Sequence, residues 1–233
     1  MAIAHRGASG VLPENTLAAF REALAMDVRD LECDVRLSRD GGIVVIHDAT
    51  VDRTTDGRGR VADLTLAALR ALDAGGGERI PLLEELLAIL PDDGRLVVEI
   101  KEDDRFPRLT DAVVSLLAKR HGPGRVGISA FEAPTLRRAR ELSPSLELSA
   151  LLRDTAGALD EALAIGVDIL CPKASAVTAE LVARLHALGC RVRAWGIQGR
   201  DEAEMARLIR CGADGMTTDY PDVLAALHRR LRG

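Results

Sequence analysis

Short apolar runs typical of β-strands alternate along this chain with longer segments whose apolar residues recur at helical spacing. The runs are rich in Val, Ile, Leu and Ala, and several of them end in a polar or charged residue. Brief, nearly continuous apolar runs predict parallel strands that are covered on both faces. The predicted strands are residues 3–5, 31–35, 96–100, 126–130, 146–151, 168–171, 192–197 and 215–218.

Amphipathic segments separate these runs, and their apolar positions repeat with the period of an α-helix. Eight strands, each followed by a helix, form a (β/α)8 TIM barrel, whose usual size of about 250 residues is close to the 233 residues here. A doubly wound open sheet is the alternative that the same alternation allows. The predicted helices are residues 16–26, 65–72, 82–90, 109–121, 133–142, 156–165, 179–188, 202–210 and 223–231.

A ninth apolar run, residues 43–46, is separated from the second predicted strand by only seven residues. A parallel crossover needs a dozen or more residues, so these two runs cannot be parallel neighbours. Asp40-Gly41 is a strong hairpin signal between them. We therefore expect a β-hairpin excursion after strand 2, which returns His47 to a place beside Asp34 at the barrel mouth.

Charged residues stand near the carboxyl ends of two predicted strands, where a core tolerates them only if they are paired. Glu32 and Asp34 are two residues apart, as are Glu99 and Lys101, so each pair points to one face of its strand. Barrel enzymes keep their active sites at this end of the barrel. Three carboxylates there predict an oxygen site for Mg²⁺ or Ca²⁺, and a salt-bridge network with Arg6 and Lys101 is the alternative.

Two histidines are expected at the same rim. His5 ends the first strand and precedes Arg6, whereas His47 follows the hairpin and precedes Asp48. A single histidine at a strand end is more often a hydrogen-bonded structural residue. Two imidazoles at one rim can serve as general acid and general base on opposite sides of one scissile bond. With the carboxylates and the cations Arg6 and Lys101, they predict catalysis on an anionic substrate held on a metal.

The composition limits the class of protein. With no long polar linker, residues 1–233 are expected to form one domain, and a net charge of −5 gives no reason to expect a nucleic-acid partner. No apolar stretch approaches the ~20 residues that span a bilayer, and no signal peptide is recognisable, so stable membrane insertion is not expected. The four dispersed cysteines are typical of reduced thiols in a cytoplasmic protein. The oligomeric state cannot be predicted.

Six groups of residues then match, in order, the motifs of one known family. They are His5-Arg6-Gly7, Pro13-Glu14-Asn15-Thr16, the stretch from Glu32-Cys33-Asp34 to Asp40-Gly41, His47-Asp48 with Asp52-Arg53-Thr54-Thr55, Glu99-Ile100-Lys101, and Gly212-Ala213-Asp214-Gly215 with Thr218-Asp219-Tyr220-Pro221. Each motif alone is weak, but together they are specific. The chain resembles the glycerophosphodiester phosphodiesterases nearly end to end.

The resemblance implies a metal-dependent phosphoric diester hydrolase that acts on a small glycerophosphodiester and releases glycerol 3-phosphate and an alcohol. It implies that a glycerol hydroxyl attacks phosphorus and that water then opens a cyclic phosphate. The implied metal is Mg²⁺ or Ca²⁺. The implied roles are metal binding for Glu32, Asp34 and Glu99, acid–base catalysis for His5 and His47, and neutralisation of the phosphodiester by Arg6 and Lys101.

Other residues of the resemblance have less certain roles. Trp195, the only tryptophan, is either a wall of the substrate pocket or a core residue, and Gly196 follows it where the family usually has Thr. Asn15 is expected to cap the helix that begins at Thr16, and Glu14 to support the site. The short segment 75–79 stands where relatives often carry an insertion, which predicts a more open mouth.

Two other functions remain open at this point. One is a related barrel that hydrolyses lysophospholipids or sphingolipids at a membrane, which would need an apolar rim. The other is a phosphate-binding barrel without catalysis. The leaving alcohol is not predictable from the sequence.

Overall fold

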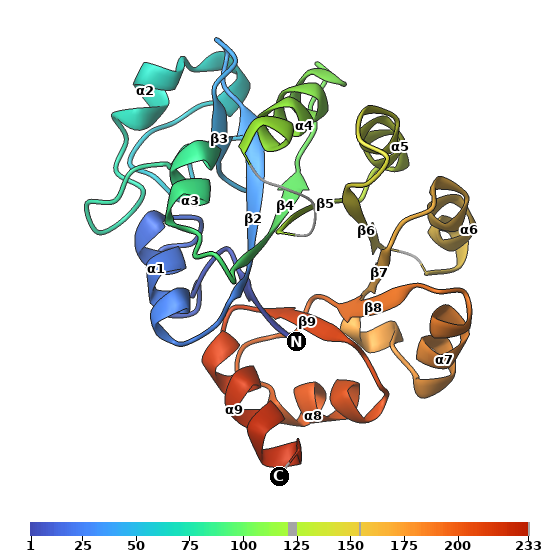
Figure 1. The fold of residues 1–233 in the computed structure, drawn as a ribbon. Coiled ribbons are helices and arrows are strands. Elements are labelled where there is room, and N and C mark those ends of the chain that lie inside the picture. Colours follow the sequence, from blue (N-terminus) through green and yellow to red (C-terminus); the bar gives the residue numbers. More distant parts are fainter. Residues whose placement is uncertain (121–124, 154, 233) are drawn as a thin grey trace.

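Eight parallel strands close into a barrel in the computed structural model, which describes all residues except 121–124, 154 and 233 (Figure 1). Each strand of the ring pairs with the next, and β1 pairs with both β2 and β9, which closes the ring. This arrangement confirms the predicted TIM barrel and excludes the open sheet. The strands are β1 (Ala2–His5), β2 (Asp30–Leu37), β4 (Arg95–Ile100), β5 (Val126–Ala130), β6 (Glu147–Leu152), β7 (Ile169–Pro172), β8 (Arg191–Ala194) and β9 (Gly215–Thr218).

Helices surround the barrel and lie close to their predicted positions (Figure 1). The predicted helix 109–121 is found as α4, and its last predicted residue, His121, lies outside the described residues. The helices are α1 (Leu17–Ala25), α2 (Leu66–Arg70), α3 (Leu83–Ile89), α4 (Arg108–Arg120), α5 (Ala133–Leu142), α6 (Thr155–Ile165), α7 (Ala179–Ala187), α8 (Glu202–Arg210) and α9 (Pro221–Arg232), with short 3₁₀ turns η1 (Val61–Asp63) and η2 (Ala174–Ala176).

The predicted hairpin is present. Strand β3 (Ile43–Val45) pairs antiparallel with the second half of β2 and lies outside the ring, on the upper left in Figure 1. Gly41 occupies the turn with φ of +92°, a conformation that glycine adopts without strain. After β3 the backbone N–H of Ile46 donates to the carbonyl of Asp34 over 2.9 Å. The next residue, His47, therefore returns to the barrel rim.

A small hydrophobic cluster of its own fixes this excursion to the barrel. Its buried members are Val44, Ile46, Val51, Val61, Leu69, Ala74 and Ile80. They come from β3, η1, α2 and the loops between them, whereas the main core lies between the barrel and its helices. Because packed side chains hold β3 and its flanks, His47 has a defined position without belonging to the barrel itself.

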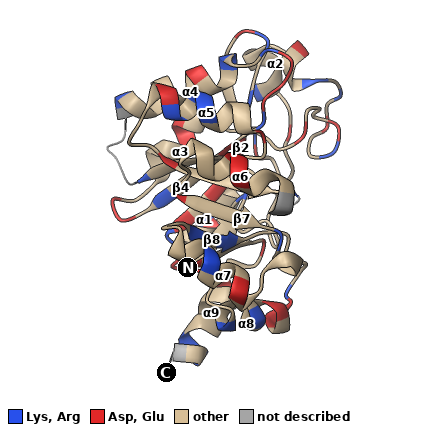
Figure 2. Cartoon of the chain, turned by 90° about the vertical axis from the view of Figure 1, so that its right-hand side faces the viewer, with Lys and Arg blue, Asp and Glu red and all other residues tan. Residues whose placement is uncertain are grey.

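Basic and acidic residues are interspersed on the outer helices α4, α5, α7 and α8 (Figure 2). No helix among the described residues is long and apolar enough to cross a membrane. Strand β8 is shorter than predicted, since it ends at Ala194 and Gly196 follows with φ of +80°. That left-handed residue turns the chain away from the barrel direction and ends the ladder.

Candidate active site

Three buried carboxylates meet inside the barrel mouth. Glu32 and Asp34 point inward from β2, and Glu99 lies beside Asp34 in the register of β4. One oxygen of each carboxylate lies within 4.8 Å of the others, and the residues are only 4, 0 and 7 % exposed, respectively. Their convergence follows from the two-residue period of a strand, which sends alternate side chains into the barrel.

Two cations lie against this triad without balancing it. Lys101 contacts Glu99 and pairs with Asp34 over 3.2 Å, and Arg6 Nε pairs with Asp34 Oδ2 over 3.0 Å. Glu32 pairs with no described Lys or Arg and accepts only the backbone N–H of Arg6, over 3.1 Å. The salt-bridge network considered as an alternative is therefore present, but it covers two of the three acids.

The pKa values of the three acids are shifted in different directions, because the two cations neutralise them unequally. Burial, followed by repulsion from Asp34, raises the pKa of Glu32 to about 7. The same two causes raise the pKa of Glu99. Burial alone would also raise the pKa of Asp34, but the adjacent Lys101 and Arg6 lower it to about 2. A carboxylate cluster of this kind, made of hard oxygen donors and holding unneutralised charge, fits a divalent cation such as Mg²⁺ or Ca²⁺.

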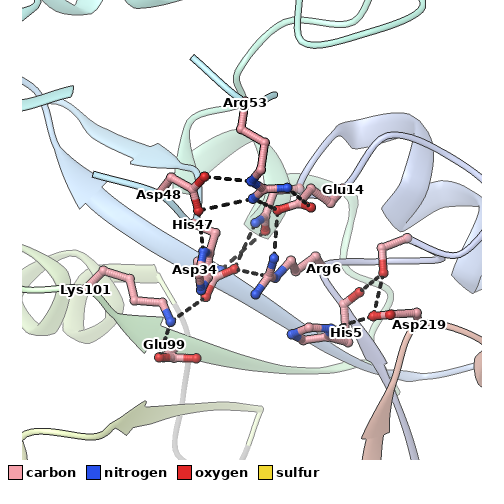
Figure 3. A network of polar contacts seen from close by, with 12 residues as sticks. His5, Arg6, Glu14, Asp34, His47, Asp48, Arg53, Glu99, Lys101 and Asp219 are labelled. Carbon is pink, nitrogen blue, oxygen red and sulfur yellow. Dashed lines mark hydrogen bonds and ion pairs between the residues drawn. The ribbon is translucent and has the colours of Figure 1, made fainter. Parts of the chain in front are cut away.

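Each of the two rim histidines is held by a carboxylate (Figure 3). His5 Nδ1 lies 2.6 Å from Asp219 Oδ1, and that oxygen also accepts the hydroxyl of Ser9 over 3.0 Å. His47 Nδ1 lies 2.6 Å from Asp48 Oδ1. A carboxylate at Nδ1 fixes the ring orientation and keeps the proton there, so the basic lone pair of the neutral imidazole is on Nε2.

A chain of ion pairs connects the hairpin histidine to the first loop of the barrel (Figure 3). Arg53 Nε pairs with Asp48 Oδ2 over 2.6 Å, and Arg53 Nη1 pairs with Glu14 Oε2 over 2.7 Å. Glu14 in turn accepts Arg6 Nη1 over 2.8 Å. Glu14 thus lies behind the site, as expected, whereas the contacts of Arg53 and the contact of Asp219 with His5 were not predicted from the sequence.

The surroundings of the two histidines shift their pKa values in opposite directions. Burial lowers the pKa of His5, but the hydrogen bond to Asp219 and the charge of Glu32 outweigh burial, so its pKa is raised. Burial lowers the pKa of His47 more than Asp34 and Asp48 raise it, so its pKa is lowered. Neighbouring groups with diverging pKa values are a property of acid–base sites.

The expectation that Asn15 caps the first helix is wrong. Thr16 is the N-cap of α1, since its hydroxyl accepts the backbone N–H of Ala19 over 3.2 Å. Asn15 adopts a left-handed conformation with φ of +58° and turns its amide inward. There Nδ2 donates to Asp34 Oδ2 over 2.9 Å, and Oδ1 accepts the Asp34 backbone N–H over 3.3 Å. Asn15 therefore fixes the most buried carboxylate of the triad.

A cavity of about 340 Å³ opens between these groups and the opposite wall of the barrel. Seven of the eight predicted site residues line it, and the eighth, Asp34, lies behind them. On the far wall Trp195 and Phe131 form a T-shaped contact, with ring centroids 5.3 Å apart and an interplanar angle of 86°. Trp195 thus lines the cavity. The seven predicted site residues that line the cavity are His5, Arg6, Glu32, His47, Glu99, Lys101 and Trp195.

Comparisons with known proteins agree with this geometry. The family model described as "Glycerophosphoryl diester phosphodiesterase family" matches residues 5–223. A glycerophosphodiester phosphodiesterase of Caldanaerobacter subterraneus subsp. tengcongensis is 36 % identical over 242 residues, covering 99 % of this chain and 98 % of the relative.

Solved structures show the same fold. An Oleispira antarctica phosphodiesterase in complex with the product sn-glycerol-3-phosphate has a TM-score of 0.91 and 30 % identity, covering 97 % of this chain and 96 % of its own. A glycerophosphodiester phosphodiesterase of Agrobacterium tumefaciens has a TM-score of 0.85 and 26 % identity, covering 96 % and 98 %. The resemblance and the enzyme class that it implied, phosphoric diester hydrolase, are confirmed. This chain belongs to the glycerophosphoryl diester phosphodiesterase family.

Proposed function

We propose that this protein hydrolyses a glycerophosphodiester to glycerol 3-phosphate and an alcohol by acid–base catalysis with His5 and His47. The observation that carries the proposal is the arrangement of both histidines, each oriented by its own carboxylate, around one cavity that Glu32 and Glu99 of the acidic triad also line. The Oleispira relative, whose structure contains sn-glycerol-3-phosphate, supports a small glycerophosphoryl substrate.

Glu32, Asp34 and Glu99 would hold Mg²⁺ or Ca²⁺, since their oxygens converge and their charge is only partly balanced. Such an ion, when bound, would act as a Lewis acid toward the phosphodiester. Arg6 and Lys101 line the same cavity and would neutralise the phosphodiester as charge develops on it. Trp195 would form the wall against which an alcohol group packs.

The two histidines would divide the proton transfers. One imidazole takes the proton of a glycerol hydroxyl as its oxygen attacks phosphorus. The other donates a proton to the leaving alcohol oxygen as its bond to phosphorus breaks, which leaves a cyclic phosphate. Water then opens the ring with the two roles reversed, giving glycerol 3-phosphate. Asp219 and Asp48 keep Nε2 of each ring available for these transfers.

We also propose a cytoplasmic location, for a reason separate from the site. All four cysteines are free thiols, and Cys33, Cys171 and Cys190 are buried. Proteins of oxidising compartments more often pair their cysteines.

The test is glycerol 3-phosphate release from glycerophosphocholine by the wild type, by His47→Ala and by His186→Ala. His186 is a matched control, because it pairs with Asp214 over 2.8 Å but lies outside the cavity. His47→Ala should lose activity about 10²- to 10⁴-fold and keep its affinity for Mg²⁺, whereas His186→Ala should keep its activity. Full activity of His47→Ala would refute the proposed roles.

A further inference from the structure

A buried cation that takes no part in the proposed chemistry lies in the far wall of the cavity. Arg193 projects from β8, which stands opposite β4 in the ring of eight strands. The residue is only 3 % exposed, yet it lines the same cavity as Glu32 and Glu99. Two of its three guanidinium nitrogens, Nε and Nη1, are buried without a hydrogen-bond partner among the described residues.

The neighbours of Arg193 do not balance its charge. It contacts the Cys171 thiol, whose pKa is raised by burial and only partly lowered by Arg193. The carboxylates on the amino-terminal side of the strands pair with other arginines. Asp30 attracts Arg193 without forming an ion pair with it and lies 3.8 Å from Arg95 Nε, and Glu147 pairs with Arg191 and, over 2.9 Å, with Arg95. Arg193 forms no ion pair with any carboxylate in the described part of the chain.

The buried guanidinium of Arg193, with two nitrogens that have no hydrogen-bond partner among the described residues, is suited to bind an anion. The guanidinium stays protonated at all accessible pH values, so it cannot relieve its burial by losing a proton. A buried charge without a partner costs several kcal/mol, and a planar fork with free N–H groups matches an oxyanion geometrically. The cations beside the triad are already paired with Asp34 and Glu99, which sets Arg193 apart from them.

The position of Arg193 indicates which part of a substrate it meets. If the reacting phosphate lies between the histidines and the triad, on β1, β2 and β4, a group that reaches β8 must extend across the cavity. The glycerol half of the substrate carries no charge of its own. An anion at Arg193 therefore belongs to the alcohol half. Trp195, in the same wall, adds a buried Nε1 donor without a hydrogen-bond partner among the described residues.

We propose that Arg193 binds an anionic group, a carboxylate or a phosphate monoester, on the leaving alcohol and so selects glycerophosphodiesters with an acidic alcohol. This inference rests on the proposed function and names its substrate class. Glycerophosphoserine and glycerophosphoethanolamine are suitable probes, because they differ by a single carboxylate.

The experiment measures kcat/KM for both probes with the wild type, Arg193→Gln and Arg193→Lys. The wild type should prefer glycerophosphoserine by about 10-fold or more, the usual effect of a hydrogen bond to a charged group. Arg193→Gln should reduce the ratio of the two kcat/KM values to near one. Arg193→Lys keeps the charge but not the planar guanidinium, so its ratio should lie between those of the wild type and Arg193→Gln. A ratio is unaffected by an overall loss of active protein.

Two results would overturn the inference. One is a wild type without preference for the serine ester, and the other is an Arg193→Gln variant that loses activity equally on both probes. The second result would mean that Arg193 serves the glycerophosphoryl part. If neither probe is hydrolysed, the proposed function fails instead. Calorimetric binding of the two probes to the wild type and Arg193→Gln then tests the same ratio without turnover.

Discussion

Replacement of Glu32 by Gln should stabilise the metal-free protein at pH 8 and change it much less at pH 5. In the folded protein the pKa of Glu32 is about 7, compared with an ordinary value of 4.5. The folded state therefore holds this proton to higher pH than the unfolded chain does. The stability associated with that proton is fully present below about pH 4.5 and is lost as the pH rises through 7. At 1.36 kcal/mol for each pKa unit, the loss is about 3 kcal/mol.

Gln keeps the size of Glu32 and removes the titration. The difference in the free energy of unfolding between Glu32→Gln and the wild type should therefore grow by about 2.5 kcal/mol from pH 5 to pH 8. Urea unfolding of EDTA-treated protein measures it, with Glu180→Gln on the exposed face of α7 as the control. A Glu32→Gln difference that stays flat across this range would refute the account of a buried, unbalanced triad.

Two further substitutions test the groups that hold the site. Asp219→Asn removes the charge at His5 Nδ1, so kcat should fall about 10- to 100-fold. The pKa of His5 in the pH–rate profile should fall as well, and an unchanged profile would contradict that role. Asn15→Ala removes two hydrogen bonds to Asp34 and should lower the free energy of unfolding by about 1–3 kcal/mol. Asn15→Gly accommodates the φ of +58° and, like Asn15→Ala, lacks the side-chain amide. An equally large loss of stability in Asn15→Gly would assign the effect to the hydrogen bonds, whereas full stability would assign it to the backbone conformation.

The barrel and the hairpin could be predicted because local signals specify them. Alternating strand and helix patterns predict the βα units, and Asp40-Gly41 with a seven-residue spacing excludes a parallel crossover. The two-residue period then places Glu32 and Asp34 on one face. These inferences need no information on distant contacts.

The groups that hold the site could not be predicted in the same way. Asp219 reaches His5 across 214 positions of the sequence, and only closure of β9 on β1 brings them together. Asn15 directly precedes a helix, and its residue type at that place predicts a cap. Its left-handed backbone turns the side chain toward Asp34 instead, and that conformation has no clear sequence signal. Arg193 lies in a strand whose apolar neighbours predict burial, but the pattern does not show that its side of the barrel interior is a cavity.

The most direct test of the proposed function is glycerol 3-phosphate release from glycerophosphocholine and glycerophosphoethanolamine, before and after EDTA treatment and after restoring Mg²⁺ or Ca²⁺. The account predicts that the wild type releases glycerol 3-phosphate, that EDTA abolishes release, and that one of the two ions restores it. Release that is unaffected by thorough EDTA treatment would contradict a metal role for Glu32, Asp34 and Glu99. No release from either substrate under any of these conditions would contradict the proposed reaction itself.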